Sequence, residues 1–455
     1  MQAPLGYREG RQSRTIVPTY APGLPLLMAA SLVFGACGPF LVVPVCAALF
    51  VWVTFRLGVK AGGPATGLVA AMVLAVSPVV LYQTVWPMSD VPAGAVWTAA
   101  LLLALGARRF DAAGAGLLVA LGLLIRPNLL PAALVVAVPL LQSGPIRERV
   151  MRLAAFGTPV AITAVFVGWL NALWFGSPLN SGYGAAGELY LWSNVLPNLK
   201  AWAAWLWQSH TPFVLLALLP VVPALRRSFN GRTLAFCCAL LIAVAASYAA
   251  YAQFEVWWYL RFLLPAFGAL AVLAAAGLLS VARVIPKPFG ALGALAALFL
   301  FVVATISFAA GQGVFGRVRD NESRYAAIAA FAATLPEDAA FVAVQHSGSL
   351  RFQTGRLTVR FDTLEYPRSE GLIPALQRAG FHPFLVIDDA EEASLRTHLG
   401  IPAGTPLPWP IRARMRELGG VTIYDAATPT STDGPVALEP EPRRWCEVPP
   451  RAGQR

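Results

Sequence analysis

The sequence predicts an α-helical polytopic membrane protein of about ten transmembrane helices, followed by a small C-terminal α/β soluble domain. Two observations carry this prediction. Hydrophobic residues make up 57% of the 455 residues and charged residues only 13%, whereas soluble proteins usually contain about 25% charged residues. Apolar segments of nearly bilayer length also recur as far as residue 310, after which charged residues return. The early part of the chain is therefore expected to lie in a membrane, and the late part in water.

The predicted spans follow a polar start. After residues 1–20, a proline-punctuated entry leads to a short interfacial helix predicted at 24–34. Ten spans are then predicted, at 38–56, 64–84, 91–107, 112–125, 127–142, 153–174, 212–225, 233–254, 262–282 and 289–310. The fourth and fifth are short for a hydrocarbon core of about 30 Å. They are expected to be broken or tilted helices on either side of Arg126-Pro127.

Composition divides the chain into four parts. Residues 1–20 are a polar N-terminal segment, interpreted as the remnant of an outer loop, and residues 21–312 form the membrane domain. Residues 313–425 are predicted to be a soluble α/β domain on the outer face, and residues 426–455 a disordered Pro-rich tail. In the soluble part, predicted strands and helices alternate. The strands are expected near 340–345, 357–361, 383–388 and 420–425, and the helices near 322–334, 371–379 and 390–399.

Basic residues are distributed unevenly between the loops. One alternate set holds twelve, namely Arg56, Lys60, Arg108, Arg109, Arg147, Arg149, Arg152, Arg226, Arg227, Arg232, Arg283 and Lys287. The opposite set holds three, Arg126, Lys200 and Arg261. Because Lys and Arg are enriched in cytoplasmic loops, the sequence predicts a multi-pass protein of the plasma (inner) membrane with its C-terminal domain on the outer, periplasmic face. The net charge is +11, but no basic run is interleaved with aromatic residues, so no nucleic-acid partner is expected.

One polar stretch separates two long apolar segments, and its sequence is Trp86-Pro87-Met88-Ser89-Asp90-Val91-Pro92-Ala93-Gly94. Asp90 is the only acidic residue between Glu9 and Asp111. A carboxylate at the end of a membrane segment is costly to desolvate, so such residues usually have a function. Two interpretations stay open with equal weight. Asp90 either caps the helix that follows, as Ser89 could equally do, or it is a functional acid that faces water or a substrate.

Two arginines in the opposite set of loops are candidate anion ligands. Arg126 lies in Ile125-Arg126-Pro127-Asn128, and Arg261 lies in Tyr259-Leu260-Arg261-Phe262. A guanidinium there could bind a phosphate through two hydrogen bonds. The alternative for Arg261 is an ion pair with Glu255 or an extended side chain that reaches the membrane interface. Both arginines lie in the set of loops that holds few basic residues, contrary to the positive-inside trend, and this slightly favours a functional role.

Other features have structural interpretations. The tryptophans of the 175–211 loop are interpreted as a belt at the membrane interface, in preference to a surface for sugar or lipid; they are Trp192, Trp202, Trp205 and Trp207. An acidic cluster is interpreted as a helix N-terminus, in preference to a metal site; it comprises Asp388, Asp389, Glu391 and Glu392. The four histidines lack metal-ligand spacing. No cofactor is predicted, and a divalent metal is left open.

Together these features resemble the polytopic C-type glycosyltransferase superfamily. The nearest resemblance is to bacterial relatives of protein O-mannosyltransferases and of the lipid A aminoarabinose transferase, over about residues 18–270. The motifs that carry it are Tyr20-Ala21-Pro22-Gly23-Leu24-Pro25, Ser77-Pro78 followed by Met88-Ser89-Asp90, Arg126-Pro127, Phe175-Gly176-Ser177-Pro178 with Gly182-Tyr183-Gly184, and Tyr259-Leu260-Arg261-Phe262-Leu263-Leu264-Pro265.

The resemblance implies transfer of a sugar from a polyprenyl-phosphate donor to an envelope acceptor (a glycan, lipid or protein) at the outer membrane face. The expected partners are therefore the lipid-linked sugar, membrane lipid and this acceptor. Asp90 matches an acidic residue of the family pattern at the start of a helix, where a carboxylate can take the proton of the acceptor hydroxyl. Arg261 matches a basic residue that can hold the lipid phosphate as it leaves. Arg126 and Tyr183, in two of the motifs, are further candidate substrate-binding residues.

The sequence departs from the family pattern at its start. The first helix and the loop acid that should follow it are absent, and Glu9 is not assigned that role. We therefore expect an upstream span, in preference to residues 1–20 crossing the membrane without a partner. The missing helix and acid leave open whether the chain as given is active or inactive. Two alternative functions remain at this point. One is an inactive family member that serves as an envelope scaffold. The other is a transporter or lipid-handling protein, which the lack of inverted repeats and of charges within spans disfavours.

Overall fold

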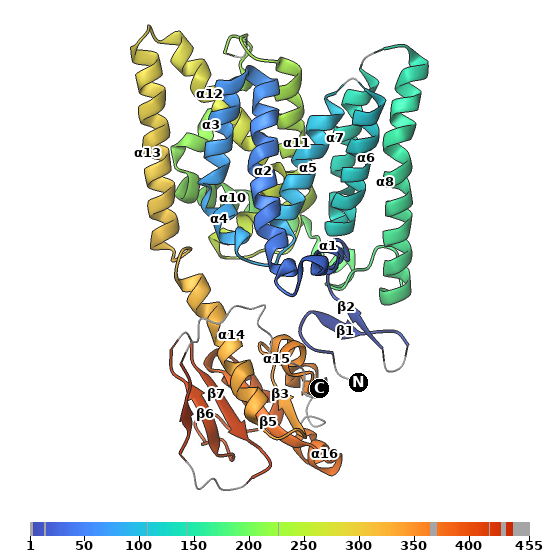
Figure 1. The fold of residues 1–455 in the computed structure, drawn as a ribbon, viewed down its shortest axis with the longest axis vertical. Coiled ribbons are helices and arrows are strands. Elements are labelled where there is room, and N and C mark those ends of the chain that lie inside the picture. Colours follow the sequence, from blue (N-terminus) through green and yellow to red (C-terminus); the bar gives the residue numbers. More distant parts are fainter. Residues whose placement is uncertain are drawn as a thin grey trace. The chain divides into compact units, whose positions relative to one another are not determined.

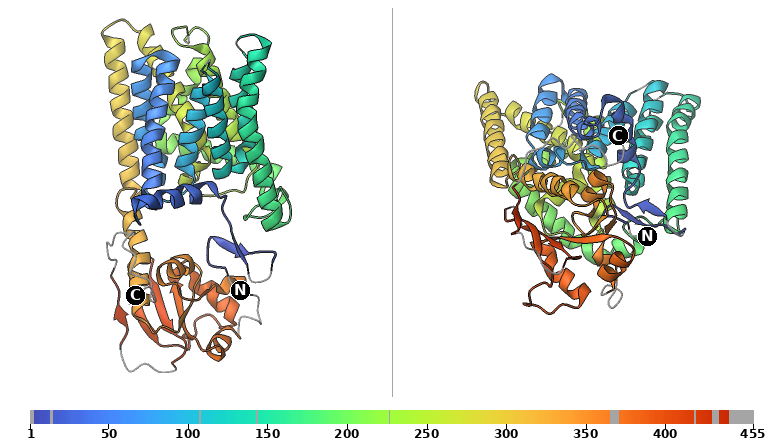
Figure 2. Two further views of the ribbon diagram at one scale, coloured as in Figure 1. Left: turned by 45° about the vertical axis from the view of Figure 1, so that its right-hand side comes forward. Right: turned by 60° about the horizontal axis from the view of Figure 1, so that its bottom comes forward.

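The computed structural model describes residues 3–12, 15–106, 108–142, 144–225, 227–364, 371–417, 419–428 and 434–439. It forms two compact units (Figures 1 and 2). The helical unit is Ala21–Phe315, and the second unit combines Met1–Tyr20 with Gly316–Arg455. The polar N-terminal segment therefore folds with the C-terminal domain. The backbone N–H of Leu5, for example, donates to Ser347 Oγ at 2.9 Å.

The helical unit contains a helix, or consecutive helices, at each of the ten predicted spans. With η denoting 3₁₀ helices, its elements are α1 (Gly23–Ser31), η1 (Leu32–Phe34), α2 (Gly38–Gly62), α3 (Pro64–Ala75), α4 (Pro78–Thr84), α5 (Asp90–Ala104), α6 (Arg109–Ile125), η2 (Pro127–Leu129), α7 (Leu130–Ala137), η3 (Val138–Leu141), α8 (Ile146–Phe175), α9 (Ala186–Leu189), η4 (Trp192–Asn194), α10 (Val195–His210), η5 (Pro212–Val221), α11 (Gly231–Ala249), η6 (Trp257–Ala266), α12 (Phe267–Val284) and α13 (Phe289–Gly311). The predicted short helix at 24–34 corresponds to α1 and η1.

Five helical segments in the described part of the chain are long and apolar enough to cross a membrane: α2, α8, α11, η6 with α12, and α13. The pair α3 and α4 adds a sixth if it is one span, although it bends by 61°. The bend lies at Ser77-Pro78, where proline lacks the N–H that would continue the helix. The remaining predicted spans are shorter helices, including α5 and η5. The prediction of a helical membrane protein is confirmed. The predicted number of about ten spans is larger than the five or six helical segments in the described residues that are long and apolar enough to cross a membrane.

Helix α5 lies in the core of the helical unit. It packs between α2 and α6 and also contacts η6 (Figure 1). Its side chains from Val91 to Thr98 are all buried, including Trp97. Gly94 permits this packing, because a Cβ there would lie 2.5 Å from the ring of Phe50. Burial of α5 on all sides places its first residue, Asp90, in the interior rather than on a lipid-facing surface.

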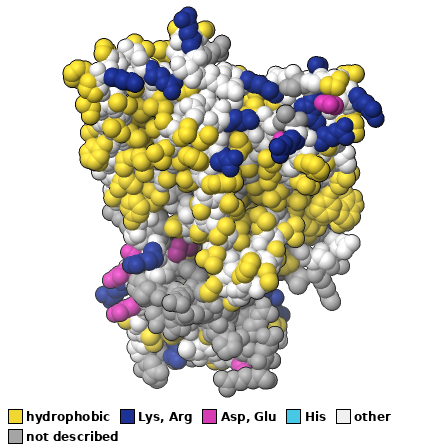
Figure 3. Space-filling model, turned by 45° about the horizontal axis from the view of Figure 1, so that its top comes forward, with side chains coloured by type: hydrophobic (Ala, Val, Ile, Leu, Met, Phe, Trp, Pro, Cys, Tyr) yellow, Lys and Arg dark blue, Asp and Glu magenta, His cyan; other side chains and the backbone are white. Residues whose placement is uncertain are grey.

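The basic loops gather at one end of the helical unit, as Figure 3 shows. They include Lys60 in the last turn of α2, Arg108 after the end of α5 and Lys287 after the end of α12. Of the twelve basic residues, Arg226 lies outside the described residues. Asp90 begins α5 whereas Arg108 follows its end, so Asp90 lies at the opposite end from the basic loops.

The second unit is a mixed α/β domain. Its elements are β1 (Tyr7–Glu9), β2 (Ile16–Pro18), α14 (Arg317–Thr334), β3 (Ala339–Val342), α15 (Ser347–Thr354), β4 (Thr358–Val359), η7 (Phe361–Thr363), α16 (Leu372–Arg378), β5 (His382–Asp388), η8 (Asp389–Glu391), α17 (Glu392–Leu399), β6 (Ile411–Met415), β7 (Val421–Asp425) and β8 (Val436–Ala437). The large sheet has the order β4-β3-β5-β7-β6-β8, and β1 pairs with β2 in a hairpin. Strands β4, β3 and β5 are parallel, whereas β7 is antiparallel to both β5 and β6.

Helices cover both faces of this sheet. Buried residues of α14, such as Ile328, pack on one face with Phe341 and Phe384. Residues of α16 and α17 pack on the other face. The four predicted strands and the predicted helices are present, but β6 and β8 were missed. In β6 the apolar side chains alternate with Arg412 and Arg414, a period of two that predicts a half-buried strand. The β8 strand falls within the predicted disordered tail, of which 429–433 and 440–455 lie outside the described residues.

We expect Phe341→Ala to destabilise the second unit by about 3–5 kcal/mol, the usual effect of removing a fully buried Phe. Phe352 provides a matched control, because it lies in the same unit and is 59% exposed. The purified full-length chain would be digested with a protease over a urea series. Phe341→Ala should shift cleavage of the unit to lower urea, and Phe352→Ala should not. Equal sensitivity of the two variants would contradict the assignment of Phe341 to the core.

Candidate functional site

Asp90 is a buried carboxylate at the first position of α5. Its exposed fraction is 1%. Ser89 is the N-cap residue of α5, and within the described chain neither side chain accepts a capping N–H of this helix. The capping interpretation of Asp90 is therefore wrong. Burial of an unpaired carboxylate is very unfavourable, so the surroundings of Asp90 must supply compensating charge.

Arg126 supplies the first of these charges. It follows the last residue of α6 and precedes Pro127, a position that disfavours helical backbone, and its φ and ψ are −142° and 87°. Its Nη2 donates to Asp90 Oδ1 in an ion pair. Its Nη1 donates to the hydroxyl of Tyr248 at 2.7 Å, and its Nε donates to Ser89 Oγ at 3.3 Å. The guanidinium thus contacts three partners in different directions.

Arg261, in η6, supplies a second positive charge. Its Nε lies 4.0 Å from Asp90 Oδ1. Its Nη1 contacts the sulfur of Met88 at 3.1 Å, and the guanidinium lies over the ring of Tyr259 at 4.7 Å. Among the described ion pairs, none joins Arg261 to Glu255, so that alternative is wrong. One carboxylate therefore faces two guanidinium groups, and the cluster carries a net positive charge that suits an anionic ligand.

Among the three charged residues of this cluster, Asp90, Arg126 and Arg261, two buried polar atoms have no hydrogen-bond partner within the described residues. They are Asp90 Oδ2, an acceptor, and Arg261 Nε, a donor. Buried polar atoms are nearly always paired, so exceptions call for an explanation. A ligand that both donates and accepts hydrogen bonds would satisfy these two atoms together. This is the chemistry that a hydroxyl group and a phosphate group would bring.

Two tyrosines of the segment between α8 and α10 lie near Arg126. Tyr183 is in a turn closed by a bridge between Ser181 and Gly184, and its hydroxyl interacts electrostatically with Arg126. Its side chain is about half exposed. Burial raises the pKa of Tyr190 to about 12, so this hydroxyl stays protonated at neutral pH. The structure therefore brings Asp90, Arg126 and Arg261 into one cluster and places Tyr183 at its edge.

Sequence reasoning missed several residues of the cluster. The hydroxyl of Tyr248, on α11, also donates to Asn128 Oδ1 at 3.3 Å. Its ring stacks on Phe262 with centroids 5.1 Å apart. Asn128 and Phe262 adjoin the two arginines in sequence and could have been found from that proximity. Tyr248 lies in an alanine-rich helix about 120 residues away, and nothing in the local sequence distinguishes it.

The tryptophans of the 175–211 loop do not form a single belt. Trp192 is 90% exposed and Trp207 is also exposed, as a membrane-interface position predicts. Trp202 is only 5% exposed and belongs to the core of the helical unit. The belt interpretation is therefore wrong for Trp202, because α10 turns this face of the helix inward.

The acidic cluster of the second unit is a helix terminus, as expected. The side chains of Asp388 and Glu391 form a capping box at η8. Asp388 also contacts His346 Nε2 at 2.8 Å and Arg324 Nη1 at 3.3 Å. Across the described residues, no group of three or more His, Cys, Asp or Glu side chains is placed to hold a metal ion.

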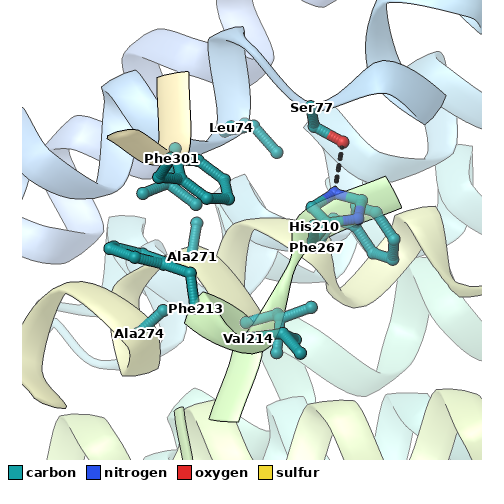
Figure 4. Close-up of a pocket in the computed structure, with 11 residues that line it drawn as sticks. Leu74, Ser77, His210, Phe213, Val214, Phe267, Ala271, Ala274 and Phe301 are labelled. Atoms are coloured by element: carbon teal, nitrogen blue, oxygen red, sulfur yellow. Dashed lines mark hydrogen bonds between the residues drawn. The ribbon is translucent and has the colours of Figure 1, made fainter. Parts of the chain in front are cut away.

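An apolar cavity lies elsewhere in the helical unit, and Figure 4 shows its lining. Aromatic and aliphatic side chains, among them Phe213, Phe267 and Phe301, line most of it. At one side Ser77 Oγ lies 2.8 Å from His210 Nε2, and His210 Nδ1 lies 2.8 Å from Ser209 Oγ. None of the candidate site residues lines this cavity, and both nitrogens of His210 are occupied. The hydrogen bond between Ser77 and His210 joins the bend between α3 and α4 to the end of α10.

We expect Arg126→Met to destabilise the helical unit by about 3–5 kcal/mol, the scale for leaving one buried charge of a pair uncompensated. Arg56→Met is the control, because Arg56 is exposed at the basic end. The thermal midpoint of the purified protein in detergent would measure both effects. The double variant Asp90→Asn/Arg126→Met should recover most of the loss. A double variant as unstable as Arg126→Met would show that the ion pair is not the cause.

No protein-family model matches the chain, and no curated protein matches it significantly. Solved structures do match. ArnT from Cupriavidus metallidurans bound to undecaprenyl phosphate has a TM-score of 0.54 and 14% identity, covering 91% of this chain and 89% of that one. The Archaeoglobus fulgidus oligosaccharyltransferase in the apo form has a TM-score of 0.50 and 13% identity, over 92% of this chain and 67% of that one. Arabinofuranosyltransferase AftD from Mycobacteria has a TM-score of 0.50 and 14% identity, over 84% of this chain and 34% of that one.

All three are C-type membrane glycosyltransferases. The similarity to ArnT extends along nearly the whole of both chains, including the C-terminal mixed-sheet domain. At such identities the matches establish the fold, and they agree with the resemblance found in the sequence motifs. The chain therefore has the fold of the C-type membrane glycosyltransferases.

Proposed function

We propose that this protein is a membrane glycosyltransferase that moves a sugar from a polyprenyl-phosphate donor to an envelope acceptor. The observation that carries the proposal is the cluster of Asp90, Arg126 and Arg261. It is buried, carries net positive charge, and leaves one acceptor atom and one donor atom unpartnered among the described residues. A donor phosphate and an acceptor hydroxyl would together complete this cluster. The fold supports the proposal, since the matching ArnT structure is bound to undecaprenyl phosphate.

The proposed reaction uses the two unpartnered atoms. The acceptor hydroxyl donates its hydrogen to Asp90 Oδ2, and its oxygen attacks the anomeric carbon of the donor sugar. The new C–O bond forms as the bond from the anomeric carbon to the phosphate oxygen breaks. The phosphate leaves with that electron pair, and the acceptor proton passes to Asp90. Arg261 Nε donates to the leaving phosphate and stabilises its developing charge.

Arg126 and Tyr183 have supporting roles in this proposal. Arg126 adds positive charge for the phosphate and fixes Asp90 through Oδ1. Tyr183 lies at the edge of the cluster with a half-exposed side chain, where it would contact the sugar or the acceptor. The identity of the sugar and of the acceptor would depend on this outer rim, because the three charged residues recognise groups common to all such substrates.

We infer that the end of the helical unit that bears the site faces the outside of the cell. The basic loops lie at the opposite end, which the positive-inside pattern assigns to the cytoplasm.

We expect Asp90→Asn to lower sugar transfer by roughly 10²-fold or more, the scale for losing a positioned acid or base. Asn keeps the size of the side chain but cannot accept the proton. Transfer from polyprenyl-phosphate-linked sugars would be measured with the protein in proteoliposomes. Asp111→Asn is the matched control, because Asp111 lies near the basic end, and its activity should equal that of the parent. Full activity of Asp90→Asn would remove Asp90 from the reaction. No transfer by the parent with any donor tested would favour a scaffold or lipid-handling protein.

The orientation gives a separate prediction. We expect a cysteine at Trp192, at the site end, to react with a membrane-impermeant thiol reagent in intact cells. Ser394→Cys, in the second unit, should react as well. Arg227→Cys, at the basic end, should react only after lysis, since the reagent cannot reach the cytoplasm. Reaction of the Arg227→Cys protein alone in intact cells would reverse the proposed orientation.

A further inference from the structure

We propose that Ser89 and Tyr248 are positioning residues that hold the Arg126–Asp90 ion pair to a single carboxylate oxygen, and so keep Asp90 Oδ2 available to the acceptor hydroxyl. This inference rests on the proposed function and extends it to two residues that touch Arg126. It follows from the way the guanidinium of Arg126 divides its nitrogens between three partners.

An arginine and a carboxylate usually pair as a fork, with two guanidinium nitrogens donating to the two carboxylate oxygens. Here Nη2 of Arg126 donates to Asp90 Oδ1, and Oδ2 has no partner within the described chain. A fork would need Nη1 or Nε as its second arm. Nη1 is bonded to Tyr248, and Nε is bonded to Ser89. Nε has a single hydrogen, which Ser89 takes, and Tyr248 takes one of the two hydrogens of Nη1, so these two contacts set the direction of the guanidinium.

Tyr248 is itself firmly held. Its hydroxyl accepts from Arg126 and gives its one hydrogen to Asn128 Oδ1, so both directions of this hydroxyl are used. Its ring is buried and stacks on Phe262 at an interplanar angle of 18°. Arg126 and Asn128 flank Pro127, where α6 ends and the regular helical bonds stop. Tyr248 therefore forms hydrogen bonds to the residues on both sides of this helix break and fixes the direction of the Arg126 side chain.

Loss of the Ser89 hydroxyl would free the single hydrogen of Nε, and loss of the Tyr248 hydroxyl would let the guanidinium turn so that Nη1 faces Asp90 Oδ2. The freed nitrogen could then donate to Asp90 Oδ2, because an unpaired buried donor and an unpaired buried acceptor would both gain a partner. Transfer of the acceptor proton to Oδ2 would first have to break that bond. The chemical step should slow, whereas donor binding should change little, since the contacts of Arg261 are not altered.

The charged groups that face Asp90 among the described ion pairs are the two arginines, Arg126 after the end of α6 and Arg261 in η6. The hydroxyls around these arginines belong to Tyr183, Tyr190, Tyr248, Tyr251 and Tyr259. Of Tyr190, Tyr248, Tyr251 and Tyr259, only Tyr248 forms a hydrogen bond to Arg126 among the contacts that the structure describes. We therefore attribute the pairing of Arg126 with only one carboxylate oxygen of Asp90 to Tyr248 and Ser89, rather than to the surrounding tyrosines as a group.

The test compares Tyr248→Phe, Ser89→Ala and Ser89→Thr in the full chain, with kcat and donor KM measured in proteoliposomes. Tyr248→Phe keeps the stacked ring and should lower kcat by roughly tenfold or more, a part of the 10²-fold or greater contribution of the positioned base. Its donor KM should stay within about twofold of the parent, because these interactions act on the chemical step. Ser89→Ala should lower kcat in the same way, and Ser89→Thr, which keeps the hydroxyl, should restore it. Tyr424→Phe, in the second unit, is the control and should behave as the parent.

A double-mutant cycle with Asp90→Asn separates positioning from general damage. In the Asp90→Asn background, Tyr248→Phe should cause little further loss, because the atom that it protects no longer accepts a proton. An equal loss in both backgrounds, a change confined to KM, or failure of Ser89→Thr to restore kcat would overturn the inference. Full activity of Asp90→Asn alone would instead refute the proposed function, so the two failures are distinguishable.

Discussion

The architecture of the helical unit depends on one constraint, the burial of a carboxylate inside a largely apolar bundle. Asp90 cannot lie there as an unpaired charge, because its desolvation would cost several kcal/mol. The ion pair with Arg126 and the nearby charge of Arg261 compensate for that burial. Asp90 begins α5, Arg126 follows the end of α6, and Arg261 lies in η6, far along the chain, so satisfying a single carboxylate draws α5, α6 and η6 together at one end of the unit.

Helix breaks make this convergence possible. Arg126 follows the end of α6 at Pro127, and Arg261 lies in a 3₁₀ helix rather than in the regular helix α12 that follows. Irregular backbone at membrane depth is tolerated only where protein or a water-filled cavity covers it. At these breaks the side chains are released from the regular spacing of a helix and can turn toward Asp90. Their directions must therefore be fixed by side-chain contacts, which Ser89 and Tyr248 supply for Arg126. Met88 and Tyr259 contact Arg261.

The two ends of the helical unit are chemically different for separate reasons. The basic end carries dispersed Lys and Arg residues, the pattern that is typical of cytoplasmic loops (Figure 3). At the other end the two arginines are mostly buried, stacked on aromatic rings and paired with a carboxylate. Side chains of the same type are thus dispersed and largely exposed at one end and mostly buried and paired at the other.

The sequence by itself determined the membrane class, the position of nearly every helix and the alternation of strands in the second unit, because these depend on local hydrophobicity and its period. It also singled out Asp90, Arg126 and Arg261, because charges are rare at such positions and therefore visible. It did not detect β6, whose short pattern is weak, nor the burial of Trp202, which depends on which face of α10 turns inward. Only the tertiary structure showed that Asp90 pairs with Arg126 and that Tyr248 holds that arginine. Such contacts join residues about 36 and 122 positions apart, and packing between helices decides them, which no local pattern encodes.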